Sequence, residues 1–236
     1  DQAYFVQLDS DDNVFVYGQT ETNWPITSGL YGKANSGQFI RKYSKSLSNI
    51  LWTTMVGAGT GYPEISPTAF LVSNCDEIYF AGWGGNVNHY SQAIHSTTSG
   101  FDTTPDAFQP STSGSNFYIA VLSKDASSLK YGTFMGGYIS SSNHVDGGTS
   151  RFDKNGKIYH AVCAACGGDP NGFTSTPNVF SSTNKSPNCN LAAFKFELNS
   201  VNVDLNAIAP QMCISDAQVF YGITDNGNAF QWDFGD

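Results

Sequence analysis

Three of the five cysteines in this chain follow one another at a spacing that can support a chemical site. Cys163 and Cys166 have the Cys-x-x-Cys spacing of zinc sites and redox motifs, and Cys189 follows them. A structural zinc site needs a second pair of ligands, which Cys189 alone does not supply. A thioredoxin-like motif needs a βαβ context, which is missing here. We therefore expect a disulfide between Cys189 and either Cys166 or Cys163, as in proteins of oxidising compartments.

His144 and Asp146 are a second candidate pair, two residues apart and just before an expected strand. Side chains two apart on a strand point to the same face, so the pair could serve as an acid and a base or as part of a metal site. The sequence offers no third partner, and the two glycines that follow suit a close approach of the backbone. We expect His144 and Asp146 to contact a partner or to support the fold rather than to catalyse a reaction.

Asp9, Asp11 and Asn13 are the densest group of oxygen ligands in the chain. Calcium takes six to eight oxygen ligands, and an EF-hand loop adds Gly at its sixth and Glu at its twelfth position. Counted from Asp9, neither residue is present here. Asp and Asn also favour turns through local hydrogen bonds. We expect a β-turn, with a Ca²⁺ site as the alternative and no other cofactor.

Tryptophans lie where strands meet loops. Trp24 and Trp83 could stack on sugars or pack against a partner protein, so both are candidate ligand contacts. Large aromatic side chains also fill the space between twisted sheets, and this packing is the favoured interpretation.

We expect no catalytic residues. The chain contains no Gly-x-Ser-x-Gly elbow, no phosphate-binding loop and no His-Glu-x-x-His motif. Glutamates are few, and none is matched with a second carboxylate in the way that glycoside hydrolysis requires. They are Glu21, Glu64, Glu77 and Glu197.

Composition narrows the class of protein. The formal net charge is -9 and there is no run of Lys or Arg, which argues against nucleic-acid binding. No stretch of 18 apolar residues predicts a transmembrane helix. Charged residues make up 13% of the chain and aromatic residues 14%, with 24 glycines. This mixture favours short β-strands joined by polar turns, in a secreted or surface protein.

A repeat defines the fold. The pattern of polar turn, apolar strand, variable loop and second apolar strand occurs three times, which is typical of an array of sheets. We expect an all-β chain with about four short antiparallel strands in each unit, which is the arrangement of a β-propeller blade. The expected strands are 3–8, 13–19, 38–43 and 50–56, then 68–73, 77–82, 117–122 and 129–134, and finally 149–153, 157–163, 191–196 and 201–205.

The variable loop falls between the second and third strand of every unit. It contains a proline in a related setting each time, in 24–27, 104–108 and 176–180. Because insertions at one loop position map to one surface of an array, we expect these loops to share a face.

Two stretches carry a resemblance to known families. "TTPDAFQPSTSGSNFYIAVLSKDASSLKYGTFMGG" and its two counterparts resemble the SBBP-type β-propeller repeat of secreted bacterial proteins. The third unit resembles the last blade of such propellers in Bacteroidota surface proteins, and the sequence "WDFGD" near residue 236 resembles the start of a PKD domain, an immunoglobulin-like sandwich of about 100 residues. The expected domains are therefore the C-terminal blades of a longer propeller over 1–205, and a linker with the truncated N-terminal part of a PKD domain over 206–236.

This resemblance implies a non-catalytic scaffold or adhesin on the outer cell surface, secreted by the type IX system and in some cases linked to gliding motility. Its partners would be other surface or secretion-system proteins, or surface glycans. Two alternatives stay open. The region could be the carbohydrate- or protein-binding accessory of a larger secreted hydrolase, or a structural subunit of an envelope or motility assembly.

Overall fold

A computed structural model of the chain describes residues 1–85, 95–138, 142–145, 150–153, 156–197, 203–207 and 220–224. These residues form strands, turns and loops without a helix, which confirms the all-β prediction. The chain divides into two compact units, Asp1–Phe196 and Glu197–Asp236. Nothing in the described ranges has the length and apolar character of a membrane-spanning helix.

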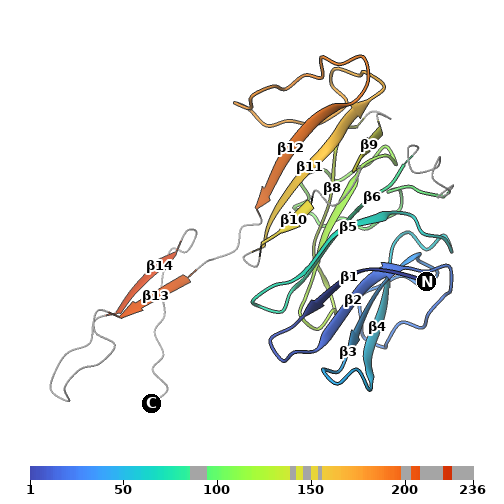
Figure 1. Cartoon of the computed structure of the whole chain (residues 1–236), viewed down its shortest axis with the longest axis vertical. Helices are drawn as coiled ribbons and strands as arrows, with labels where there is room; N and C mark the ends of the chain where they lie inside the picture. The colour runs from blue at the N-terminus through green and yellow to red at the C-terminus, as the bar shows by residue number, and fades with distance from the viewer. Residues whose placement is uncertain are drawn as a thin grey trace. The chain divides into compact units, whose positions relative to one another are not determined.

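The first two sheets each contain four antiparallel strands in sequence order (Figure 1). Their positions agree with the prediction to within two residues at each end. The first sheet contains β1 (Gln2–Leu8), β2 (Val14–Gln19), β3 (Gln38–Tyr43) and β4 (Ile50–Val56). The second sheet contains β5 (Ser66–Val72), β6 (Ile78–Trp83), β7 (Phe117–Leu122) and β8 (Leu129–Met135).

The third sheet has a different outline. Its strands β10 (Ser150–Phe152), β11 (Lys157–Cys166) and β12 (Asn190–Glu197) lie in that order, and β9 (Ser142–His144) also pairs with β11. The prediction of a fourth strand at 201–205 is wrong. Strand β13 (Val203–Ala207) pairs instead with β14 (Phe220–Thr224) in a separate two-stranded sheet. The expected domain boundary after residue 205 falls inside β13.

The three sheets repeat one register. In each sheet, the last residue of the first strand pairs with a residue of the second strand that has the same position in the repeat. The pairs are Leu8 with Val14, Val72 with Ile78, and Phe152 with Ile158. The sequence repeat is therefore a structural repeat, and equivalent positions of the sheets can be compared directly.

The turns between these strands repeat as well. Asp9, Ser73 and Asp153 each accept a side-chain hydrogen bond from the backbone N–H group four residues later. The residue just before that donor has a positive φ, which is 65° at Asp12 and 80° at Gly156. Asp and Gly adopt this backbone conformation more readily than other residues, so the polar turn residues encode the strand pairing.

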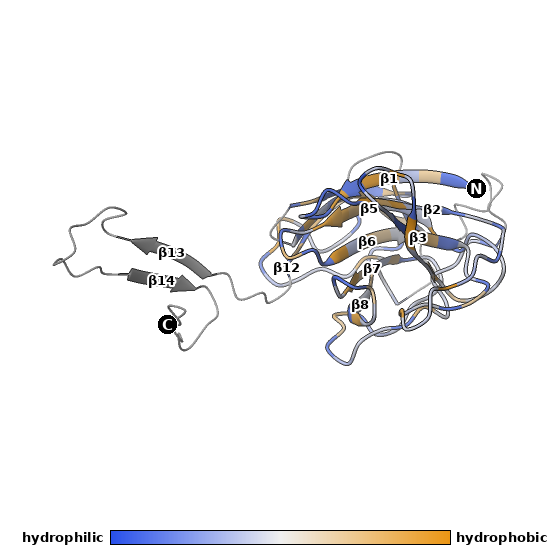
Figure 2. Cartoon of the chain, turned by 90° about the horizontal axis from the view of Figure 1, so that it is seen from below, coloured by the Kyte–Doolittle hydropathy of each residue, from blue (hydrophilic) through white to orange (hydrophobic). Residues whose placement is uncertain are grey.

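Aromatic side chains fill the space between the sheets. The Tyr17 ring lies 5.4 Å from Phe70 and 5.6 Å from Phe80, which joins the first sheet to the second. The Phe117 ring lies 6.1 Å from Phe194, which joins the second sheet to the third. Apolar residues gather on the strands, and the connecting loops are mostly polar (Figure 2). Strand β5 contacts both β1 and β10, so the first strands of the sheets are neighbours.

The second sheet is covered on both faces, whereas the other two each have one open face. Val6 and Leu8 of β1 are 63% and 53% exposed, although the equivalent residues of β5, Phe70 and Val72, are 5% and 2% exposed. This difference arises because the first sheet covers β5, and no described sheet covers the corresponding face of β1.

Candidate functional site

A disulfide closes the long loop of the third sheet. It joins Cys166, the last residue of β11, to Cys189, which immediately precedes β12. This confirms one of the two expected pairings, and Cys163 lies outside the bond. Because the bridged residues are 23 positions apart, the whole loop is held at its base.

The backbone beside the disulfide is fixed by two asparagines. The Ala165 N–H group donates to Oδ1 of Asn143 at 2.8 Å, and its carbonyl accepts from Nδ2 of Asn184 at 3.0 Å. The second amide hydrogen of Asn184 is used on the Asn188 carbonyl at 2.8 Å. Ala165 has a positive φ of 53°, so these bonds hold an unfavourable conformation of a non-glycine residue.

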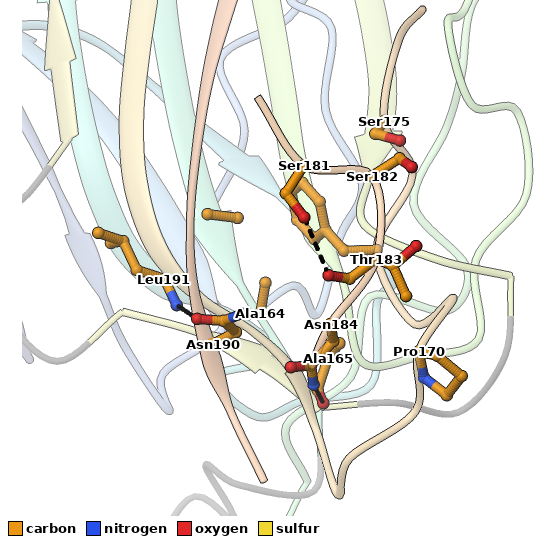
Figure 3. A pocket seen from close by; sticks show the side chains of 12 residues that line it. Ala164, Ala165, Pro170, Ser175, Ser181, Ser182, Thr183, Asn184, Asn190 and Leu191 are labelled. Carbon is orange, nitrogen blue, oxygen red and sulfur yellow. Dashed lines mark hydrogen bonds between the residues drawn. The ribbon is translucent and has the colours of Figure 1, made fainter. Parts of the chain in front are cut away.

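A pocket of about 80 Å³ lies between this loop and strands β11 and β12 (Figure 3). Hydroxyl and amide groups line much of it, with one aromatic ring, Phe173. The Ser181 hydroxyl donates a local hydrogen bond to the Thr183 carbonyl at 3.2 Å. A small concave site with hydroxyl groups and one ring suits a small polar ligand. The lining residues are Ala164, Ala165, Pro170, Phe173, Ser175, Ser181, Ser182, Thr183, Asn184, Asn190, Leu191 and Ala192.

His144 of β9 and Trp83 of β6, two of the predicted contact residues, pack against each other. The centres of their rings are 5.7 Å apart, and each residue is 8% exposed. His144 also reaches the disulfide, with its Nδ1 atom 3.6 Å from Sγ of Cys166. Asp146 lies outside the described residues, so the pairing of His144 with Asp146 stays a prediction.

Trp24 lies apart from this group, on the long loop of the first sheet. Its ring centre is 4.5 Å from that of Phe39, and the guanidinium carbon of Arg41 lies 3.6 Å from the Trp24 ring centre. This is a cation–π contact on a half-buried ring. Trp24 thus packs on the outer face of its own sheet.

The oxygen ligands around Asp9 are used by the protein itself. Lys42 forms an ion pair with Oδ2 of Asp9 at 2.6 Å, and the backbone N–H groups of Asp11 and Asn13 donate to Oδ1. Burial raises the pKa of the Asp9 carboxyl, but the hydrogen bonds from Lys42 and Asn13 outweigh it and lower the pKa overall. The arrangement is that of a turn held by a carboxylate, and a cation at Oδ2 would have to displace Lys42.

Glu64 is a buried carboxylate whose role the sequence does not reveal. It is 0% exposed and accepts hydrogen bonds from the backbone of Gly37, Ala58 and Thr60 and from the Thr60 hydroxyl. These donors belong to the long loop and the last connection of the first sheet. Glu64 therefore fastens that sheet to the start of the second, and no local pattern in the sequence marks such a contact.

No protein-family model matches this chain, and a search of curated proteins finds no relative.

Proposed function

We propose that the chain is a non-catalytic scaffold region of a secreted or cell-surface protein, in which the three sheets are consecutive blades of a longer β-propeller. The observation that supports this most directly is the repeated register of neighbouring sheets whose first strands adjoin. Blades of a propeller are four-stranded sheets arranged in this way around a channel, usually four or more in number.

The open faces support the same proposal. In the second sheet, Phe70 and Tyr79 point to opposite faces, and each is 5% exposed. The equivalent residues at the two ends of the array, Val6 and Tyr159, are 63% and 42% exposed. Further blades on both sides would cover them. The sequence "WDFGD" supports a PKD stalk as the proposed next domain.

The long loops fit a display role because the strands hold them firmly. In the first sheet, the Thr27 N–H group donates to the Thr53 carbonyl at 2.9 Å, and in the second sheet Thr104 bonds in the same way to Gly132 at 3.0 Å. Each loop therefore runs along the outer strand of its sheet. Loops of different sequence on one rigid frame are suited to adhesion, or to contacts with surface and secretion-system proteins.

Labelling of intact cells tests the proposed location and scaffold role. Producing cells are treated with a membrane-impermeant biotin reagent and then with a protease, with a cytoplasmic enzyme as the control. The protein is expected to be labelled and cleaved before lysis, while the control is protected. Protection of both proteins until the cells are lysed would contradict a surface scaffold exported by a type IX system.

Binding of glycans is a second candidate function, favoured by the hydroxyl-lined pocket of the third sheet. It would make the chain the carbohydrate-binding accessory of a larger hydrolase. A glycan array probed with the folded chain is expected to give positive spots, and Ser182→Ala with Thr183→Val should weaken them at least tenfold. Ser46→Ala in an exposed turn is the matched control. An array without signal from folded protein would eliminate this candidate.

A further inference from the structure

We propose that His144, Cys166 and Cys189 form a binding site for a thiophilic divalent cation such as Zn²⁺ when the disulfide is reduced. One nitrogen or sulfur atom of each residue lies within 4.8 Å of the other two. The residues come from three places in the third sheet: the end of β9, the end of β11 and the position just before β12. The site thus differs from the Cys-x-x-Cys pair that the sequence suggests, because His144 takes the place of Cys163.

The distances suit zinc. Zinc bonds of about 2.3 Å to sulfur and 2.0–2.1 Å to nitrogen, at a tetrahedral angle, separate the two ligand atoms by about 3.6 Å. The Nδ1 atom of His144 is already 3.6 Å from Sγ of Cys166. After reduction, the two sulfur atoms would need to lie about 3.8 Å apart, which side-chain rotation can supply.

The surroundings favour a metal. His144 is 8% exposed and packs beside Trp83, so its ring is held in place and partly shielded from water. The hydrogen bond from Ala165 to Asn143 ties β11 to β9 one residue from both Cys166 and His144. Three protein ligands leave a fourth position for water or another ligand, as in zinc sites that are not closed.

Formation of the metal site requires reduction of the disulfide. A dithiol reductant passes two electrons and two protons to the disulfide, which yields the thiols of Cys166 and Cys189 and a disulfide in the reductant. Zinc binding then ionises both thiols and releases two protons. The same loop, 167–188, is thereby closed in two ways, by a covalent bond under oxidising conditions and by a metal under reducing conditions.

Cobalt binding to the whole chain tests the site. The chain is reduced with a phosphine, which becomes a phosphine oxide with oxygen from water, and is titrated with Co²⁺ without oxygen. We expect thiolate-to-cobalt charge-transfer absorption that saturates near one equivalent and disappears when Zn²⁺ is added. The oxidised chain should show no such band. Cys166→Ser, Cys189→Ser and His144→Ala should each weaken binding at least tenfold.

The remaining cysteines provide the matched control. A chain with Cys75→Ser, Cys163→Ser and Cys213→Ser is expected to bind Co²⁺ within twofold of the parent. If these substitutions abolish the band, or if His144→Ala leaves it unchanged, a Cys-x-x-Cys site or scattered thiols hold the metal and the proposal is wrong.

A second readout separates lost binding from lost folding. Limited proteolysis of the reduced chain should cut within 167–188, and Zn²⁺ should slow this cleavage at least fivefold in the parent but not in His144→Ala. The oxidised His144→Ala chain should resist the protease as the oxidised parent does. Equal cleavage of the reduced parent with and without Zn²⁺ would overturn the proposal.

Discussion

The second and third sheets have the same strand register, but residues at equivalent positions differ in burial. Tyr79 of β6 and Tyr159 of β11 occupy equivalent positions, because Ile78 and Ile158 before them pair with Val72 and Phe152. Tyr79 is 5% exposed beside the third sheet, and Tyr159 is 42% exposed. The same residue type at the same position is core in one sheet and surface in the other. The neighbouring sheet, rather than the residue, decides which.

The loops of these two sheets differ in a related way. Strand β8 holds the loop around 104–108. The Phe134 N–H group donates a hydrogen bond to the Gln109 carbonyl, and the Tyr131 hydroxyl accepts one from the Phe108 N–H group. Within the described residues, no strand lies outside β12 in the third sheet. Phe180, the counterpart of Phe108, is fully exposed. A disulfide holds the base of this loop, and we infer that it compensates for the missing outer strand.

The largest difference is expected at the matched tyrosines. Tyr79→Ala should lower the free energy of unfolding by about 4 kcal/mol because it leaves a cavity between two sheets. Tyr159→Ala should cost less than about 1 kcal/mol on the open face. Urea denaturation of both variants measures the difference. Equal losses would show that the face of the third sheet is covered after all.

Removal of the disulfide tests whether it stabilises the long loop of the third sheet in the absence of an outer strand. Cys166→Ser with Cys189→Ser should lower the free energy of unfolding by about 3 kcal/mol, because a loop of this length is no longer closed in the unfolded chain. Denaturation without metal, compared with the Cys75→Ser control, provides the measurement. An unchanged midpoint would mean that the hydrogen bonds of Asn184 suffice to hold the loop.

His160 makes the third sheet sensitive to pH at a position where the second sheet has a phenylalanine. It occupies the position of Phe80, stacks on Phe194 with ring centres 4.8 Å apart, and has no partner on Nε2 within the described structure. Burial lowers the pKa of His160 from 6.5 to about 4. The folded form therefore binds fewer protons than the unfolded form, and stability should fall as the pH decreases from about 6.5 to about 4.

This loss should reach about 2 to 3 kcal/mol at the lower end of that range. His160→Phe, which copies the second sheet, should remove this part of the pH dependence. Urea midpoints at several pH values compare the variant with the parent. Parallel pH curves for the two proteins would assign the effect to other groups.

The smallest contrast concerns the loop phenylalanines. Phe108 packs on Phe196 with ring centres 6.0 Å apart, so Phe108→Ser should cost about 1 kcal/mol. Phe180→Ser should change stability by less than about 0.5 kcal/mol because the ring contacts little. Thermal unfolding resolves the two. A larger loss for Phe180→Ser would reveal a contact outside the described residues.

Much of the strand pattern could be read from the sequence because it is encoded locally. Repeated apolar segments predict the strands of the first two sheets, and residues such as Asp12 and Gly156 predict the turns through their tolerance of positive φ. The prediction of a fourth strand in the third sheet is wrong because the pairing of strands is not encoded locally. An alternating segment such as 201–205 predicts a strand without identifying its partner, and β13 pairs with β14.

The candidate site was only partly accessible from the sequence. Residue types and spacing indicated a disulfide at Cys189, and the sequence by itself determined the cysteines, the turns and the repeat. Only the tertiary structure selected Cys166, placed His144 beside it and Trp83, and buried Glu64 between sheets. Those contacts join segments far apart in the chain. They depend on how the sheets pack against each other, which no local pattern specifies.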